Sequence, residues 1–301
     1  MSFNINHIQS VSFGVCLDSE TEESYRIVPS EIGVQNALTS MLKDTLMEIN
    51  KEGTVIEDFS PAEKYGATER LRVSLESEWV QKHKRVFLAE NLSIDTHGLD
   101  IPSSLVSYFA IFHDIDGNKL MGFRRAAQFK GVVKKHLVTI TNDALCLVAD
   151  NLFKLDSDFD FLIFDEQILI WRPSGFIFTA CMDEYIVAYA TANVAHIAAE
   201  ISCVNFSALN GYIAKHKLAM RLVAAIKSRN DLGEITKQRL RAECKDSGVK
   251  LIQKDGMLLP AEGSEMGFLM LLDRRRYTVM LVPKHPETYE APSRHLATTI
   301  E

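Results

Sequence analysis

The chain has 301 residues, of which 47% are hydrophobic and 24% are charged, and its formal net charge is −7. This composition excludes an intrinsically disordered chain and disfavours a protein that binds a polyanion over its whole surface. The five cysteines are scattered along the sequence, without the clustered spacing of a zinc site. We therefore expect free thiols in a reducing compartment, with no metal and no cofactor.

The N-terminal half is predicted to contain strands and one long helix. Apolar residues alternate at 11–17, as in a half-buried strand, and recur on one helical face between Ser30 and Gly53. Residues 60–63 (SPAE) have the spacing of a capping box, which predicts a further helix start. More strands are predicted at 105–113, 119–129, 137–141 and 145–149.

The turn between two of these strands contains Asp114, Asp116 and Asn118, which invites a calcium-loop interpretation. An EF-hand loop needs glycine at its sixth position and glutamate at its twelfth. This turn has its glycine fourth and Arg125 twelfth. We therefore interpret it as a polar hairpin turn.

The segment FDFLIFDEQILIW, residues 159–171, is apolar except at its centre. This pattern predicts a tight hairpin in the middle of a sheet that is covered on both faces. Asp158, Asp160, Asp165 and Glu166 suggest the carboxylate cluster of a metal-dependent nuclease, but the lysine that usually follows the second acid is missing. Because no other catalytic motif is present, we expect binding rather than catalysis.

The C-terminal half is predicted to be mainly helical. Helices are predicted at 183–202, 207–228, 234–246 and 262–273, and strands at 249–252 and 277–282. On the second helix His216 shares an apolar face, so we interpret it as a hydrogen-bonded core histidine. His196 and Glu200 lie one turn apart and are interpreted as a buried polar pair or an interface contact.

The most apolar window, residues 185–204, approaches the length of a membrane span but contains Asn193, His196 and Glu200. We interpret it as a buried amphipathic helix. The first residues lack the basic and apolar regions of a signal peptide. The protein is therefore expected in the cytoplasm, and at the inner face of the membrane only through a partner.

Strands and helices do not alternate regularly, which favours an α+β fold with a mixed or antiparallel sheet and a helical C-terminal half. Residues 1–110 contain 9 basic and 17 acidic side chains, whereas residues 111–301 contain 24 and 23. These balances, −8 and +1, sum to the net charge of −7. We predict two domains, an acidic N-terminal α+β domain at 1–135 and a C-terminal α+β domain at 136–301.

Basic residues gather in several places, with few aromatic residues between them. The predicted DNA contacts are Arg124, Lys130, Lys134, Lys135, Lys217, Arg221, Lys237, Arg241, Lys245, Arg274, Arg275 and Arg276. Lys237, Arg241 and Lys245 are spaced by four and share one helical face, and Arg124 is expected to point away from the apolar face of its strand. Rows of lysine and arginine neutralise phosphates without reading bases, which favours the duplex backbone over single-strand stacking. The alternative is a solvated helix face or pairing with the acidic N-terminal part.

Three segments together resemble the KwaB family: FDFLIFDEQILIW, the following GFIFTACMDEY, and the C-terminal FLMLLDRRRYTVMLVPKHPETYEAPSRH. The resemblance covers roughly residues 105–300, in the order hydrophobic hairpin, helical middle and final strand. KwaB is the cytoplasmic subunit of the bacterial two-gene Kiwa anti-phage defence system.

The resemblance implies a homodimeric, DNA-binding effector that docks beneath a membrane-embedded, KwaA-like partner and acts without a defined enzymatic reaction. It assigns no DNA contact to a position of this chain, so the basic residues above are predictions from charge alone. Two alternatives remain. One is a protein-binding adaptor that uses helix 183–202 and the acidic N-terminal part, and the other is an atypical nuclease that uses Asp158, Asp160 or Asp165.

Overall fold

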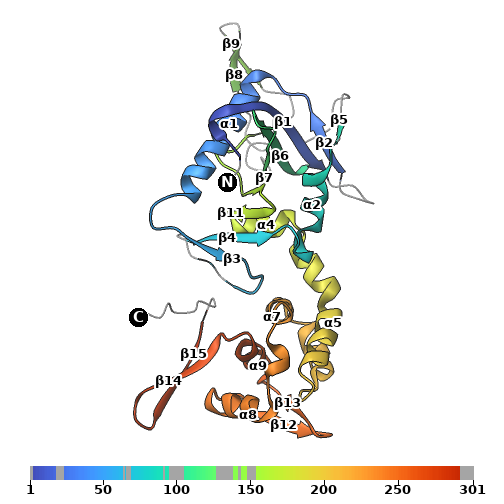
Figure 1. Cartoon of the computed structure of the whole chain (residues 1–301), viewed down its shortest axis with the longest axis vertical. Coiled ribbons are helices and arrows are strands. Elements are labelled where there is room, and N and C mark those ends of the chain that lie inside the picture. Colours follow the sequence, from blue (N-terminus) through green and yellow to red (C-terminus); the bar gives the residue numbers. More distant parts are fainter. Residues whose placement is uncertain are drawn as a thin grey trace. The chain divides into compact units, whose positions relative to one another are not determined.

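The computed structural model describes residues 3–17, 24–63, 65, 69–90, 92–94, 105–126, 138–141, 144–147 and 154–291. The chain forms two compact units, unit 1 (1–58 and 68–182) and unit 2 (59–67 and 183–301). One unit is built on a large sheet and the other on helices, which confirms the α+β class (Figure 1). The domain boundary predicted at 135/136 lies outside the described residues and stays a prediction.

Unit 1 is built on a nine-stranded sheet with the order β3-β4-β11-β10-β7-β6-β1-β2-β5. Its strands are β1 (Ile8–Leu17), β2 (Ser24–Val28), β3 (Val55–Asp58), β4 (Glu69–Ser74), β5 (Ser93–Ile94), β6 (Leu105–Asp114), β7 (Lys119–Arg125), β10 (Phe161–Phe164) and β11 (Gln167–Ile170). A separate hairpin is formed by β8 (Val138–Thr141) and β9 (Ala144–Leu147). The central strands pair antiparallel, whereas the edge pairs β2–β5 and β3–β4 are parallel. The sheet is therefore mixed, as predicted.

Helices cover both faces of this sheet. They are η1 (Ile5–His7), α1 (Ile32–Ile49), η2 (Glu78–Val80), α2 (Gln81–Leu88) and α4 (Pro173–Thr179). Buried leucines of α1 pack against Tyr108, Phe112 and Phe159 on one face. On the other face His83 of α2 packs edge-on against Phe161. The hairpin β10–β11 is thus central and covered on both sides, which confirms that prediction (Figure 1).

Unit 2 consists mainly of helices, with two β-hairpins at its edges (Figure 1). Its elements are α5 (Met182–Glu200), η3 (Phe206–Leu209), α6 (Asn210–Ile213), α7 (Lys217–Lys227), η4 (Leu232–Glu234), α8 (Lys237–Asp246), β12 (Leu251–Lys254), β13 (Met257–Pro260), α9 (Glu265–Leu272), β14 (Arg276–Val282) and β15 (His285–Glu290). Phe206 contacts Phe268 of α9 in its core, with ring centroids 6.0 Å apart. Among the described residues, no helix is both long and apolar enough to cross a membrane.

The capping-box prediction at residues 60–63 is wrong, because residues 61–62 form a turn. In a capping box the backbone N–H of Ser60 would donate to the side chain of Glu63. Here it donates instead to the Tyr65 hydroxyl at 2.5 Å. That hydroxyl donates to the Ser60 carbonyl at 3.1 Å. The Tyr65 hydroxyl therefore bonds to both the N–H and the carbonyl of Ser60, the residue at which a helix was predicted to begin.

The helix predicted at 207–228 is broken at His216, whose backbone is extended (φ −127°, ψ 106°) and precedes α7. The His216 ring is exposed, stacks on Tyr212 at 4.2 Å, and its Nδ1 bonds to the Tyr212 carbonyl. The core-histidine interpretation is therefore wrong. His196 and Glu200 are also exposed on α5, so they do not form a buried pair.

Candidate nucleic-acid interface

A basic groove lies in unit 2 between α8 and the β12–β13 hairpin, with a volume of about 450 Å³. Arg241, Lys245 and Lys250 line it, and none of its described lining residues is acidic. Lys250 was not among the predicted contacts, because the return strand β13 that completes the hairpin was not recognised. We call this feature the basic groove.

The local sequence explains why the cations of α8 face outward. The Thr236 hydroxyl caps the helix by accepting from the Arg239 N–H at 3.3 Å, and Gly248 follows its end with a φ of +70°. Leu240 and Cys244 are buried and fix the inward face. The predicted row of Lys237, Arg241 and Lys245 therefore lies beside the buried face, on the flank of α8 whose side chains reach the β12–β13 hairpin.

The positive charge of this row is not cancelled by acids. Lys237 donates to the Gly256 carbonyl at 2.5 Å, and Arg241 donates to the side-chain oxygen of Gln253. Both acceptors are neutral. In the described part of the chain, no ion pair involves the predicted row or Lys250. Glu243, an acid on the same helix, is paired with Arg239 at 2.8 Å.

Cys244 lies at the floor of the basic groove and adds no negative charge to it. Burial, assisted by the nearby Glu243, raises the pKa of its thiol to about 12. The thiol is therefore neutral at physiological pH.

Free cysteines occur at four described positions, Cys16, Cys181, Cys203 and Cys244.

Lys217 and Arg221 lie elsewhere, beside a mainly apolar pocket of about 330 Å³ between α5 and α7. Arg221 is paired with Asp183 at 2.5 Å, and Glu184 lines the same pocket. Two cations are thus balanced by two acids. Lys217 and Arg221 therefore do not add net positive charge to the surface of unit 2.

Arg274, Arg275 and Arg276 do not form the shared phosphate-binding cluster that the sequence predicts. Arg274, at a positive φ of 59°, is paired with Asp231, and Arg276 is paired with Glu290. Arg275 is only 4% exposed and donates to the backbone carbonyls of residues 62 and 291. Each arginine therefore stabilises a different part of unit 2.

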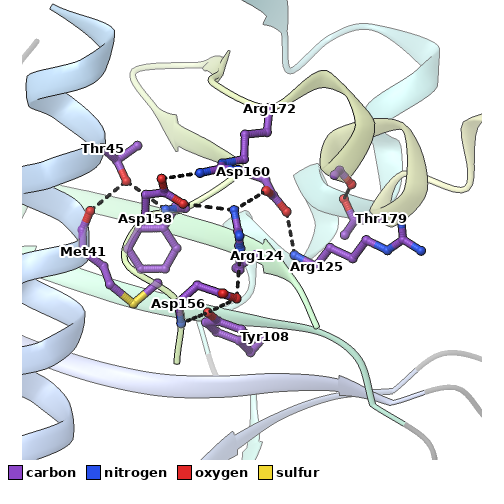
Figure 2. Close-up of polar contacts among 12 residues, drawn as sticks. Met41, Thr45, Tyr108, Arg124, Arg125, Asp156, Asp158, Asp160, Arg172 and Thr179 are labelled. Atoms are coloured by element: carbon purple, nitrogen blue, oxygen red, sulfur yellow. Dashed lines mark hydrogen bonds and ion pairs between the residues drawn. The ribbon is translucent and has the colours of Figure 1, made fainter. Parts of the chain in front are cut away.

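Arg124 is also an internal residue, although it was predicted to contact DNA. Its side chain is 14% exposed and donates to Asp156, Asp158 and Asp160 at 3.1, 3.0 and 2.8 Å (Figure 2). Burial alone would lower the pKa of Arg124, but the three carboxylates outweigh it and raise that pKa. Arg172 completes the Arg–Asp cluster through Asp158 at 2.5 Å.

Asp160 connects the Arg–Asp cluster to the backbone of unit 1. One carboxylate oxygen accepts from Arg124, and the other accepts from the backbone N–H of Arg125 at 2.7 Å (Figure 2). Its carbonyl accepts from the N–H groups of Trp171 and Arg172, both at 2.8 Å. Asp160 thereby ties the end of β7 to the segment that leads into α4.

Comparison with known families identifies the chain. A family model described as Kiwa protein KwaB-like matches residues 105–277, which is more than half of the chain. The chain belongs to this family. It is therefore a component of the Kiwa antiviral defence system, as the sequence resemblance indicated. No curated protein and no solved structure matches it.

The family match covers both features described above. In this KwaB-like chain it begins with β6 and ends within β14, so it includes the Arg–Asp cluster and the basic groove. Lys130, Lys134 and Lys135 also fall within the match, but they lie outside the described residues. Their role stays a prediction.

The acids considered for a nuclease do not gather in this KwaB-like chain. Asp158 and Asp160 are bonded to arginines before β10, whereas Asp165 and Glu166 form the turn after it, about 15 Å further along the chain. Within the described residues, no three His, Cys, Asp or Glu side chains are placed to hold a metal ion.

The calcium-like turn of this KwaB-like chain is a polar hairpin turn, as interpreted from the sequence. One oxygen of Asp114 accepts from the backbone N–H groups of Asp116 and Asn118 at 3.0 and 2.8 Å. Its other oxygen accepts from the N–H of Asn4 and the amide of Asn118. The carboxylate is therefore used to hold the turn.

Replacing Gly175 with alanine in this KwaB-like chain is expected to lower the free energy of unfolding by about 1–3 kcal/mol. A Cβ at this position would lie 2.2 Å from the carboxylate of Asp160, which is held by two hydrogen bonds. Denaturant unfolding of the variant measures the change. Gly211→Ala, which meets no atom within 4 Å, is the matched control, and equal losses in both would contradict the packing argument.

Proposed function

We propose that this KwaB-like protein is a DNA-binding effector of Kiwa defence, with the basic groove as its contact surface for the duplex backbone. The observation that supports it is the row of cations on α8, for which the described part of the chain contains no ion pair with an acid. Phosphate binding needs charge of this kind and no base-reading geometry.

The dimensions of the row suit a duplex. Lys237 and Lys245 are eight residues apart on a helix, which corresponds to about 12 Å. A duplex carries about seven phosphates over that length. The described lining residues of the basic groove include no aromatic ring, so a stacking platform for single-stranded bases is lacking there.

The affinity of the protein for duplex DNA is expected to fall steeply with salt. Lys237, Arg241, Lys245 and Lys250 together predict a slope of log K against log salt of about −3.5, or about a hundredfold loss between 50 and 200 mM. Fluorescence-anisotropy titrations of a short duplex at several salt concentrations measure the slope. An absence of binding at 50 mM salt would contradict the proposal and favour the protein-binding adaptor.

The proposal also includes a homodimer that docks in the cytoplasm on a membrane-embedded, KwaA-like partner. Family membership supports this part of it. A surface suited to protein contact is present on α5, where Val187 is 54% and Tyr189 is 49% exposed. The same surface is what favours the adaptor as the second candidate function.

We propose binding without catalysis. Two of the aspartates considered for a nuclease, Asp158 and Asp160, are each bonded to an arginine. A metal ion would have to compete with these guanidinium groups, whose charge-assisted hydrogen bonds are among the stronger ones in proteins.

A further inference from the structure

A second pocket, separate from the basic groove, lies in unit 1 beside the Arg–Asp cluster. Its volume is about 520 Å³, within the range of small-molecule sites. Arg125, Arg172, Ser174 and Phe178 are among its lining residues. Arg125 ends β7, Arg172 is the N-cap of α4, and Ser174 and Phe178 belong to α4 itself.

The charge that this pocket presents to solvent is positive. The side chains of Asp156, Asp158 and Asp160 are only 4% to 12% exposed, because they are directed inward at Arg124. Arg172, by contrast, is 45% exposed, and Arg125 is exposed at the end of β7. Arg172 has five N–H donors and uses one nitrogen for Asp158, so its guanidinium can also bind an anion.

A flat platform lies in the same pocket. The guanidinium of Arg125 is 3.8 Å from the centroid of the Phe178 ring, which is 41% exposed. The backbone N–H of Arg125 donates to the Asp160 carboxylate, which fixes the point from which the Arg125 side chain reaches the Phe178 ring. Nucleobases stack on aromatic rings and on guanidinium planes, and such a pair offers both.

We propose that this pocket binds a nucleoside phosphate, with the phosphate at Arg172 and Ser174 and the base against the Arg125–Phe178 pair. The guanidinium groups of Arg125 and Arg172 lie on opposite sides of the Asp160 carboxylate, so the two ends of the ligand are bound apart (Figure 2). The ligand is either a free nucleotide or the terminal nucleotide of a DNA strand. The site does not rest on DNA binding by the basic groove.

Isothermal titration with dAMP, deoxyadenosine and inorganic phosphate tests the proposal. The wild-type protein is expected to bind dAMP more tightly than either of its parts. Arg125→Ala, which keeps the backbone bond to Asp160, should weaken both dAMP and deoxyadenosine about tenfold. Arg172→Gln should weaken dAMP alone. Arg72→Ala, an exposed arginine on β4 outside the lining, is the control and should change nothing.

The outcomes separate this site from the basic groove. Loss of dAMP binding in Arg125→Ala supports the proposal whether or not the basic groove binds DNA. No binding of dAMP at millimolar concentration, or equal binding by the wild type and Arg125→Ala, overturns it. Correct folding of each variant is checked by its unfolding curve.

Competition then distinguishes the two ligand sources. A 5′-phosphorylated oligonucleotide that displaces dAMP, when the 5′-hydroxyl form does not, assigns the pocket to a DNA end. Displacement by mononucleotides alone assigns it to free nucleotides.

Discussion

Replacing Arg124 with alanine is expected to lower the free energy of unfolding of unit 1 by about 3–5 kcal/mol. Arg124 bonds to three carboxylates that are at most 12% exposed, and alanine would leave them facing one another. Among the described residues, Arg172 and Lys154 would remain to pair with Asp158 and Asp156. Removing one partner of a buried ion pair is costly because the other charge stays buried.

Tryptophan fluorescence during urea unfolding measures this loss. Trp79 and Trp171 are the two tryptophans of the chain and both belong to unit 1, so the signal reports on that unit. Arg72→Ala is the matched control, since its ion pair with Asp58 is exposed and should contribute less than about 1 kcal/mol. Similar small losses in both variants would show that the Arg–Asp cluster contributes little to stability.

The loss in free energy of unfolding caused by Arg124→Ala is expected to become smaller as the pH falls. Burial raises the pKa of Asp160, while the Arg125 N–H and the charge of Arg124 oppose that rise. Without Arg124 the folded-state pKa rises further, so the folded variant takes up a proton more readily than the unfolded chain. This contribution to stability is present at low pH and is lost as the pH rises through the folded-state pKa. The difference from the wild type should therefore be smaller at about pH 5 than at about pH 8.

Local periodicity was enough to predict several elements of the fold. The apolar pattern of residues 159–171 identified a central hairpin, and the spacing of Lys237, Arg241 and Lys245 placed them on one face of α8. Both features depend on which face of a single element is buried, and a short window of sequence contains that information. The hairpin β12–β13 was missed even though its turn, Asp255-Gly256, is a strong hairpin signal with both φ angles positive.

Contacts between distant residues could not be predicted in this way. Arg124 meets its aspartates 32 to 36 positions along the chain, and one sequence does not show which strands are neighbours. The run of three arginines at 274–276 also led to a wrong prediction, that of a shared phosphate-binding cluster. Arg274 has a positive φ at the end of α9, and the three side chains then point to different partners. Arg274 reaches Asp231, Arg275 reaches the carbonyl of residue 291, and Arg276 reaches Glu290. A run of like charges in sequence therefore did not become a patch in space.

The basic groove is the feature on which the proposed function depends most. Changing Lys237, Arg241 and Lys245 together to glutamate is expected to weaken duplex binding at about 100 mM salt by more than about a hundredfold. Three phosphate contacts are lost and three repulsive charges are added, so the salt slope should also flatten by about 2.7. The buried side of α8, with Leu240 and Cys244, is unchanged, so unit 2 should remain folded.

The control for this variant must carry the same change in net charge. Lys43, Lys51 and Arg72 are exposed residues of unit 1, and reversing them also takes the formal charge from −7 to −13, since each reversal changes it by −2. Anisotropy titrations of both variants with the same duplex then separate a local contact from general repulsion. The control is expected to lose less than about tenfold, because none of its three residues lines the basic groove and salt screens exposed charges outside the contact surface. Equal losses in the two variants would remove the basic groove from the proposed DNA surface.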